Sequence, residues 1–187
     1  MDINSFIELA AARHSCRNYL EKPVSDDAIK KCLLAAQLAP SACNKQPWRF
    51  VIVRERAKLD AICEKALLPG IPMPWLKKAP VIVALCSQRS IETHWLAPLL
   101  SGVQYDLVDV GIAGEHFVLA AEAQGLATCW IGWFKARPLK RILGIPLSVK
   151  PLSLISLGYP ASSSPATKRL ELSQIASLDG WGKPFES

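Results

Sequence analysis

The chain contains 187 residues, half of them hydrophobic, and carries a formal net charge of +6. This length suits one domain, so we expect a single domain over residues 1–187. The apolar content is too high and the charge too moderate for a disordered chain. The basic residues are scattered without a run of five or more. That pattern argues against a protein dedicated to nucleic acid and leaves an anionic small ligand as the alternative.

The cysteines and the apolar runs indicate in which cellular compartment the protein is expected. The six cysteines, at positions 16, 32, 43, 63, 86 and 129, form no C-x-x-C pair and match no zinc spacing. We therefore expect reduced, buried thiols in a cytoplasmic protein, and no metal site. No apolar segment of a signal peptide is visible. The longest uncharged apolar run, Ala79 to Cys86, is far shorter than the roughly 20 residues that span a membrane.

Capping residues and apolar patterns predict the first half of the fold. Ser25 is a good helix N-cap, Asp26 and Asp27 favour the positive end of a helix dipole, and Pro40 would end that helix. Strands are expected where β-branched and apolar residues gather. The expected elements are a helix over residues 3–12, a helix from Ser25 to Pro40, a strand over Trp48–Val53, a helix over 56–67, a proline-rich loop over 69–80 and a strand over Val81–Cys86.

The second half centres on a helix expected over residues 102–124. Its apolar residues recur at helical spacing nearly all round, and many are small, which is typical of a buried helix that another helix approaches closely. A strand over Thr128–Phe134, a short helix over Pro138–Leu143 and a strand over Pro151–Leu157 follow. This order predicts an α+β fold with a mixed central β-sheet flanked by helices.

The tail from Ala161 onward is rich in serine and proline at first and then has little pattern. Such a tail is either flexible or docked on a partner. The large apolar side chains of Trp181 and Phe185 favour docking, because these groups gain free energy when they are buried.

Two polar segments could carry chemistry. The first is Arg13-His14-Ser15-Cys16-Arg17, in which two guanidinium groups four residues apart flank a hydroxyl. Arginine offers a planar fork that matches phosphate oxygens, so this segment could grip one phosphate. The alternative is a solvated helix end, and the composition alone does not separate the two interpretations.

The second segment is the loop Ala39-Pro40-Ser41-Ala42-Cys43-Asn44-Lys45-Gln46-Pro47-Trp48. Its prolines restrict the backbone, while its serine, asparagine and glutamine supply donors and acceptors. Such a loop could bind a planar heterocycle; the alternative is an ordinary turn before an edge strand. The sequence contains no Rossmann, Walker, G-x-S-x-G or H-E-x-x-H motif, which argues against a dedicated dinucleotide-binding domain, a catalytic triad and a zinc site.

Four sequence blocks together resemble the nitroreductase family. They are R-H-S-C-R-N-Y, A-P-S-A-C-N-K-Q-P-W-R-F, D-V-G-I-A-G-E-H-F-V-L-A-A-E-A-Q-G-L-A-T-C-W-I-G-W-F and L-I-S-L-G-Y-P, in family order from residue 13 to 160. The resemblance implies a nitroreductase-like α+β homodimer with one FMN in each of two interface sites. It also implies that the tail, about residues 161–187, is swapped onto the partner subunit. Turnover would be ping-pong: NAD(P)H reduces the flavin and leaves, and then a nitro-aromatic, quinone or similar planar acceptor takes the electrons.

The resemblance also implies roles for individual residues. Arg13, Ser15 and Arg17 would hold the phosphate and ribityl end of FMN, with His14 contributing through its backbone or ring. Pro40, Ser41, Ala42 and Asn44 of the other subunit would line the isoalloxazine, and Gln46 would reach the ribityl chain. Ile131 and Gly132 would present backbone groups to the flavin ring, and Lys168 or Arg169 would close on the phosphate from the tail. No catalytic side chain is expected, because the cofactor carries the redox chemistry.

The acceptor side of the site is less defined by the sequence. Trp75, His94 and Trp95 are candidates for substrate contact, with an ordinary packing role as the alternative for each. Two other functions on the same scaffold remain open. One is a flavin-binding protein without turnover, and the other is a specialised flavin enzyme that fragments flavin or removes halide.

Overall fold

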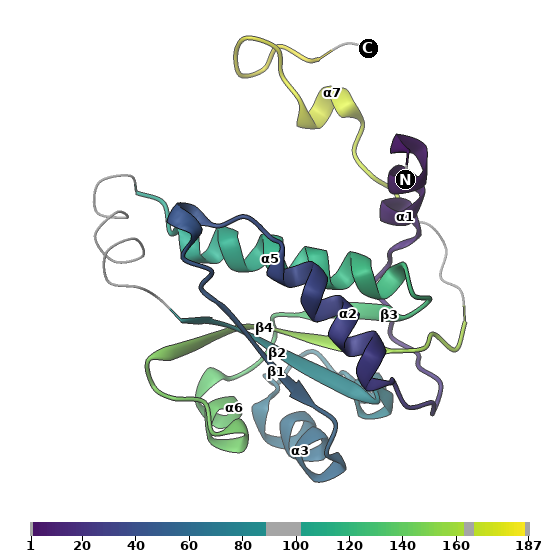
Figure 1. Ribbon diagram of the computed structural model, residues 1–187, viewed down its shortest axis with the longest axis vertical. Coiled ribbons are helices and arrows are strands. Elements are labelled where there is room, and N and C mark those ends of the chain that lie inside the picture. The colour runs from purple at the N-terminus through teal and green to yellow at the C-terminus, as the bar shows by residue number, and fades with distance from the viewer. Residues whose placement is uncertain (1, 89–101, 163–166, 186–187) are drawn as a thin grey trace.

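The computed structural model describes residues 2–88, 102–162 and 167–185. Its centre is a four-stranded sheet with helices on both faces (Figure 1). The strands are β1 (Trp48–Val53), β2 (Val81–Gln88), β3 (Ala127–Ile131) and β4 (Val149–Gly158), in the spatial order β1-β2-β4-β3. Neighbouring strands pair antiparallel. The α+β class is therefore confirmed. Within the described residues, parallel pairing is limited to one bridge at the sheet edge, between Ser15 and Thr128.

The helices form a layer on each side of the sheet. In Figure 1, α2 (Asp26–Gln37) and α5 (Tyr105–Glu122) lie over one face, and α3 (Arg56–Ala61) and α6 (Ala136–Leu143) lie under the other. A π-helical turn over Ile62–Ala66 continues α3, and short 3-10 turns occur at Ala42–Asn44 and Pro74–Lys78. The predicted elements are thus present, except that the proline-rich loop contains a helical turn and the third strand stops at Ile131, three residues before Phe134.

Each face of the sheet has its own apolar core. On one side, Val83 and Leu85 of β2 pack with α2 and α5, and the rings of Phe50 and Phe117 stack with centroids 5.6 Å apart. On the other side, Ile82 and Ala84 belong to the core beneath α3 and α6. Because β2 is central and covered on both faces, its sequence is continuously apolar instead of alternating.

Local signals fix the positions of α2 and α5. Ser25 caps α2 as predicted, since its hydroxyl accepts a hydrogen bond from the Ala28 amide over 3.2 Å. Gly114 brings α5 close to the sheet: a Cβ added there would lie 2.2 Å from the Trp130 ring and 2.7 Å from Leu85. Glycine is therefore required at this position, because any side chain would push the central helix away from β3.

Two segments at the chain ends lie outside this compact body. The helix α1 (Ile3–Ala12) has no buried residue, and the tail with α7 (Leu172–Ile175) projects away from the sheet (Figure 1). The Ala161 amide, at the start of the tail, donates a hydrogen bond to the Asn18 carbonyl over 3.0 Å, whereas the hydrogen bonds of residues 167–185 lie within the tail. Exposed apolar side chains occur on both segments: Ile3, Phe6, Ile7, Leu170, Leu172, Ile175, Leu178, Trp181 and Phe185. A single chain thus leaves an unusually apolar surface uncovered.

Candidate functional site

The segment Arg13–Arg17 lies along the free edge of β3. The Cys16 amide donates a 2.9 Å hydrogen bond to the Thr128 carbonyl, and Ser15 bridges Thr128. Just beyond, the Tyr19 hydroxyl donates to the Cys16 carbonyl over 2.9 Å and lies 2.7 Å from the Ser156 hydroxyl. Burial raises the pKa of Tyr19, so its hydroxyl stays protonated as a donor. These bonds hold the segment that carries both arginines in a fixed place.

A cavity of about 390 Å³ opens beside this edge. Arg17, Ile131 and Gly132 all line this cavity. In the sequence, only the family resemblance indicated that these three residues belong to one site. The remaining wall is largely apolar and aromatic: Ile71, Pro72, Met73, Trp75, Cys129, Trp130 and Trp133. Trp75, a candidate for substrate contact, therefore does line a cavity. A largely apolar cavity whose lining includes the cation Arg17 suits a ligand with an apolar body and an anionic group.

His14 adds an unusual polar atom to this half of the site. Its Nδ1 lies 3.2 Å from the Ala12 carbonyl oxygen. Its Nε2 is buried and, in the described part of the chain, has no hydrogen-bond partner. Buried polar atoms are normally satisfied, so an unsatisfied one suggests a missing ligand. With Arg13 and Arg17 close by in sequence, the chemistry of this donor set fits a phosphate.

The loop over residues 40–46 is the second half, and its backbone is strained. Cys43, Asn44 and Gln46 all adopt the left-handed conformation, with φ angles of 50°, 52° and 47°. Such angles cost roughly 1–3 kcal/mol for residues other than glycine and cluster at functional sites. Internal bonds support the turn: Ser41 Oγ accepts from the Gln46 amide over 2.9 Å, and Gln46 Nε2 donates to Asn44 Oδ1 over 3.0 Å.

Two further residues, Asp109 and Arg49, hold this loop, and sequence reasoning missed both. Asp109 of α5 accepts a hydrogen bond from the Ala42 amide. Arg49 donates to the Gln46 carbonyl over 3.0 Å and to Gln88 Oε1 over 2.8 Å. For Asp109 the available signal was that Asp106 and Asp109 are the acidic residues among the otherwise nonpolar buried residues of α5.

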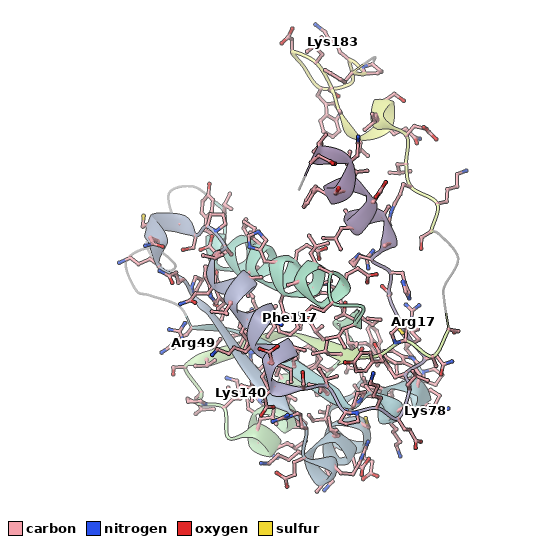
Figure 2. All side chains as sticks on the ribbon, turned by 45° about the vertical axis from the view of Figure 1, so that its right-hand side comes forward. Arg17, Arg49, Lys78, Phe117, Lys140 and Lys183 are labelled. Atoms are coloured by element: carbon pink, nitrogen blue, oxygen red, sulfur yellow. The ribbon has the colours of Figure 1, made fainter. Side chains whose placement is uncertain are left out.

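The two halves do not meet within one chain. Ala42 is fastened to the first turns of α5, whereas Ser15 is bridged to β3, which follows the last turn of that helix. Glu122 lies 13 positions after Asp109, which corresponds to about 20 Å along a helix. Figure 2 shows the same separation, with Arg17 and Arg49 on opposite sides of the molecule.

The remaining predicted residues are placed as follows. Lys168 and Arg169 are exposed in the tail and belong to neither half in this chain. His94 and Trp95 lie outside the described residues. In the described part of the chain, no group of three His, Cys, Asp or Glu side chains is arranged to bind a metal ion. Over the same residues, every helix falls short of the length or apolar character needed to cross a membrane.

Comparison with known proteins identifies the family. The model of the "Nitroreductase family" matches residues 10–159, which include both halves of the site and the whole sheet. The chain belongs to the nitroreductase family. The match begins just before Arg13 and ends just after β4, so the tail lies beyond it.

Individual members of the nitroreductase family agree with this assignment. A protein of Archaeoglobus fulgidus, provisionally named an NADH dehydrogenase/NAD(P)H nitroreductase, is 35% identical over 160 residues, which cover 82% of this chain and 84% of the relative. The FMN reductase [NAD(P)H] of Bacillus subtilis is 31% identical over 180 residues, covering 90% and 71% of the two chains. A crystal structure of a nitroreductase family protein from Clostridium novyi NT superposes with a TM-score of 0.76 at 26% identity, covering 99% and 97%. The predicted family and fold are thereby confirmed, and the chain is assigned to oxidoreductases related to NAD(P)H-using enzymes.

Proposed function

We propose that this chain is an FMN-dependent oxidoreductase that passes electrons from NAD(P)H to a nitro-aromatic, quinone or similar planar acceptor. One observation carries the proposal. The arginine segment and the strained loop lie at opposite ends of α5, and we propose that each forms half of an FMN site. Two copies that bring these ends together would assemble two complete sites, so we propose a homodimer.

The residues of the β3 edge suit the phosphate end of FMN. Arg13 and Arg17 supply guanidinium groups, Ser15 supplies a hydroxyl, and the buried Nε2 of His14 lacks a partner in the described chain. Arg17 also faces the cavity walled by Ile131 and Gly132, whose backbone would meet the flavin ring. Charged donors on a phosphate are among the strongest hydrogen bonds in proteins.

The strained loop would meet the flavin from the partner subunit. Pro40, Ser41, Ala42 and Asn44 would line the ring, and Gln46 would approach the ribityl chain. The Ala42 amide is already used by Asp109, so its contact with the ring would involve the methyl or carbonyl group. Lys168 or Arg169 of the exposed tail would complete the phosphate site.

FMN, when bound, supplies the redox chemistry as an electron carrier between donor and acceptor. The protein's own residues would bind the flavin, orient it and shield it from water. Trp75 and Trp133 line the cavity, where their aromatic side chains would favour a planar apolar molecule. Lys45 is a cation on the strained loop, where it would stabilise negative charge on the ring.

The uncovered apolar surface supports the proposed dimer. Leu107 and Val108 on α5 are exposed, and so are Phe6 and Ile7 on α1 and Trp181 in the tail. Burying such side chains removes apolar surface from water, which favours assembly. All six cysteines are free, which is consistent with the reducing cytoplasm that we propose as the compartment.

The test is an absorbance spectrum of the purified protein followed by anaerobic addition of NADH or NADPH. Flavin bands that bleach would support the proposed enzyme and reveal the preferred nucleotide. Bands that persist would instead indicate a flavin-binding protein without turnover. A colourless protein that takes up no added FMN would overturn the proposal.

A further inference from the structure

Asp109 is a carboxylate buried in the middle of the fold, with 3% of its surface exposed. Its two oxygens lie 3.1 and 3.2 Å from the Ala42 amide nitrogen, 67 residues earlier in the chain. Burying a carboxylate is costly unless it is hydrogen-bonded. Because a hydrogen-bond partner of Asp109 is the amide at the start of the strained loop, the buried carboxylate has a structural role in fixing that loop.

The loop needs such an anchor because its own conformation is unfavourable. Residues 43, 44 and 46 hold left-handed backbone angles although none of them is glycine. Conformations of this kind persist only where surrounding contacts over-determine them. The loop is fastened at both ends: by Asp109 at Ala42, and by Arg49 and Gln88 at Gln46 and Pro47, where the Gln88 amide donates to the Pro47 carbonyl over 2.8 Å.

The neighbouring acid, Asp106, has a different partner. It is also fully buried in α5, one turn before Asp109, but it accepts a hydrogen bond from the Ser87 hydroxyl of β2 over 2.9 Å. The helix therefore carries two buried carboxylates, three residues apart. Asp109 bonds the loop directly, whereas Asp106 bonds the sheet.

We propose that Asp109 is a positioning residue that holds the backbone of residues 42–46 in its left-handed form and thereby sets the affinity for flavin. It acts through the Ala42 amide, and it does not touch the ligand. The effect on flavin rests on the proposed function, whereas the effect on the loop does not. A charged acceptor makes this bond stronger than one between neutral groups.

The experiment compares Asp109→Ala with Asp106→Ala, because both variants remove a buried carboxylate from the same stretch of helix. The dissociation constant of FMN should rise at least tenfold in Asp109→Ala and less than threefold in Asp106→Ala. Asp109→Asn keeps an acceptor oxygen for the Ala42 amide, so its dissociation constant should stay within threefold of the wild-type value. Thermal unfolding of each variant shows that the protein remains folded under the assay conditions.

Hydrogen exchange of the peptide over residues 40–47 tests the loop without any flavin. Exchange at Ala42 should accelerate at least tenfold in Asp109→Ala but not in Asp106→Ala. Equal effects of the two alanine variants, or unchanged exchange in Asp109→Ala, would overturn the positioning role. If wild-type protein binds no FMN while the exchange result holds, the proposed function fails and the loop anchor stands.

Discussion

The Cys16 amide donates a hydrogen bond to the Thr128 carbonyl over 2.9 Å, and this bond fastens the N-terminal segment to the edge of β3 beside the Ser15–Thr128 bridge. It places Arg17 in the wall of the cavity that also includes Ile131 and Gly132. These residues are more than a hundred positions apart in sequence, and this edge contact brings them to one site.

Arg17→Ala should therefore weaken FMN binding by about 10- to 100-fold, since a hydrogen bond to a charged group is worth about 1.5–3 kcal/mol. Fluorescence titration of the apoprotein with FMN measures the change. Arg141→Ala, on the helix α6, provides a control with the same loss of charge away from this cavity. An unchanged affinity in Arg17→Ala would remove the β3 edge from the proposed phosphate site.

The approach of α5 to the sheet depends on Gly114. In Gly114→Ala the new Cβ would lie 2.2 Å from Trp130 Cη2. Overpacking of this kind lowers the free energy of unfolding by about 1–3 kcal/mol, which denaturant titration would measure. Gly111→Ala on the same helix is the comparison, because within the described residues its added methyl meets nothing beyond its own stretch of helix within 4 Å. Wild-type stability in Gly114→Ala would show that the helix can shift away from β3 at little cost.

Two buried thiols make the fold sensitive to alkali. Burial raises the pKa of Cys32 and of Cys86 from the ordinary value of 9.0 to about 11. The fold favours the protonated thiol, so this stabilisation is complete below pH 9 and is lost as the pH rises through 11. We expect about 1–3 kcal/mol less stability per thiol over that range.

Thermal unfolding from pH 8 to 11 tests this pH dependence. The double variant with Cys32→Ala and Cys86→Ala should show a flatter profile than the wild type, whereas Cys43→Ala, which alters an exposed thiol, should not. The assignment to these thiols is wrong if the double variant and the wild type lose stability in parallel.

The exposed tail leads to a prediction about the stability of the proposed dimer. Trp181 is fully exposed in the single chain, and buried tryptophans commonly dominate interfaces. Trp181→Ala should raise the dimer dissociation constant about 10- to 100-fold in sedimentation experiments, whereas Lys183→Ala should leave it nearly unchanged. Equal dissociation constants for all three proteins would contradict docking of the tail on the partner.

Much of the fold could be predicted because its signals are local. Ser25 caps α2, and the continuous apolar run of β2 marks a strand covered on both faces. The end of the third strand was less predictable: Trp133 and Phe134 look like strand residues, but the ladder with β4 stops at Ile131, and the Phe134 backbone bridges Leu67 instead. That outcome depends on a segment more than sixty residues away.

The candidate site was predictable only in part, because it too depends on contacts between segments that are far apart in the sequence. Arg13–Arg17 and the 40–46 loop stood out by composition and by the family resemblance. The anchor Asp109 did not, because an aspartate in a helix shows its importance only when its burial and its bond to Ala42 are known. Likewise, the left-handed backbone of Cys43 and Gln46 was not predictable, because this conformation favours glycine and neither residue is glycine.

The most direct test of a site shared by two subunits is FMN binding to mixed dimers of Arg17→Ala and Asn44→Ala chains, each of which should bind FMN weakly by itself. If the β3 edge of one subunit and the loop of the other form one site, a mixed dimer contains one site with both changes and one site with neither. Mixed dimers should therefore bind one FMN with wild-type affinity. Uniformly weak binding, with no site of wild-type affinity in the mixed dimers, would contradict the shared site.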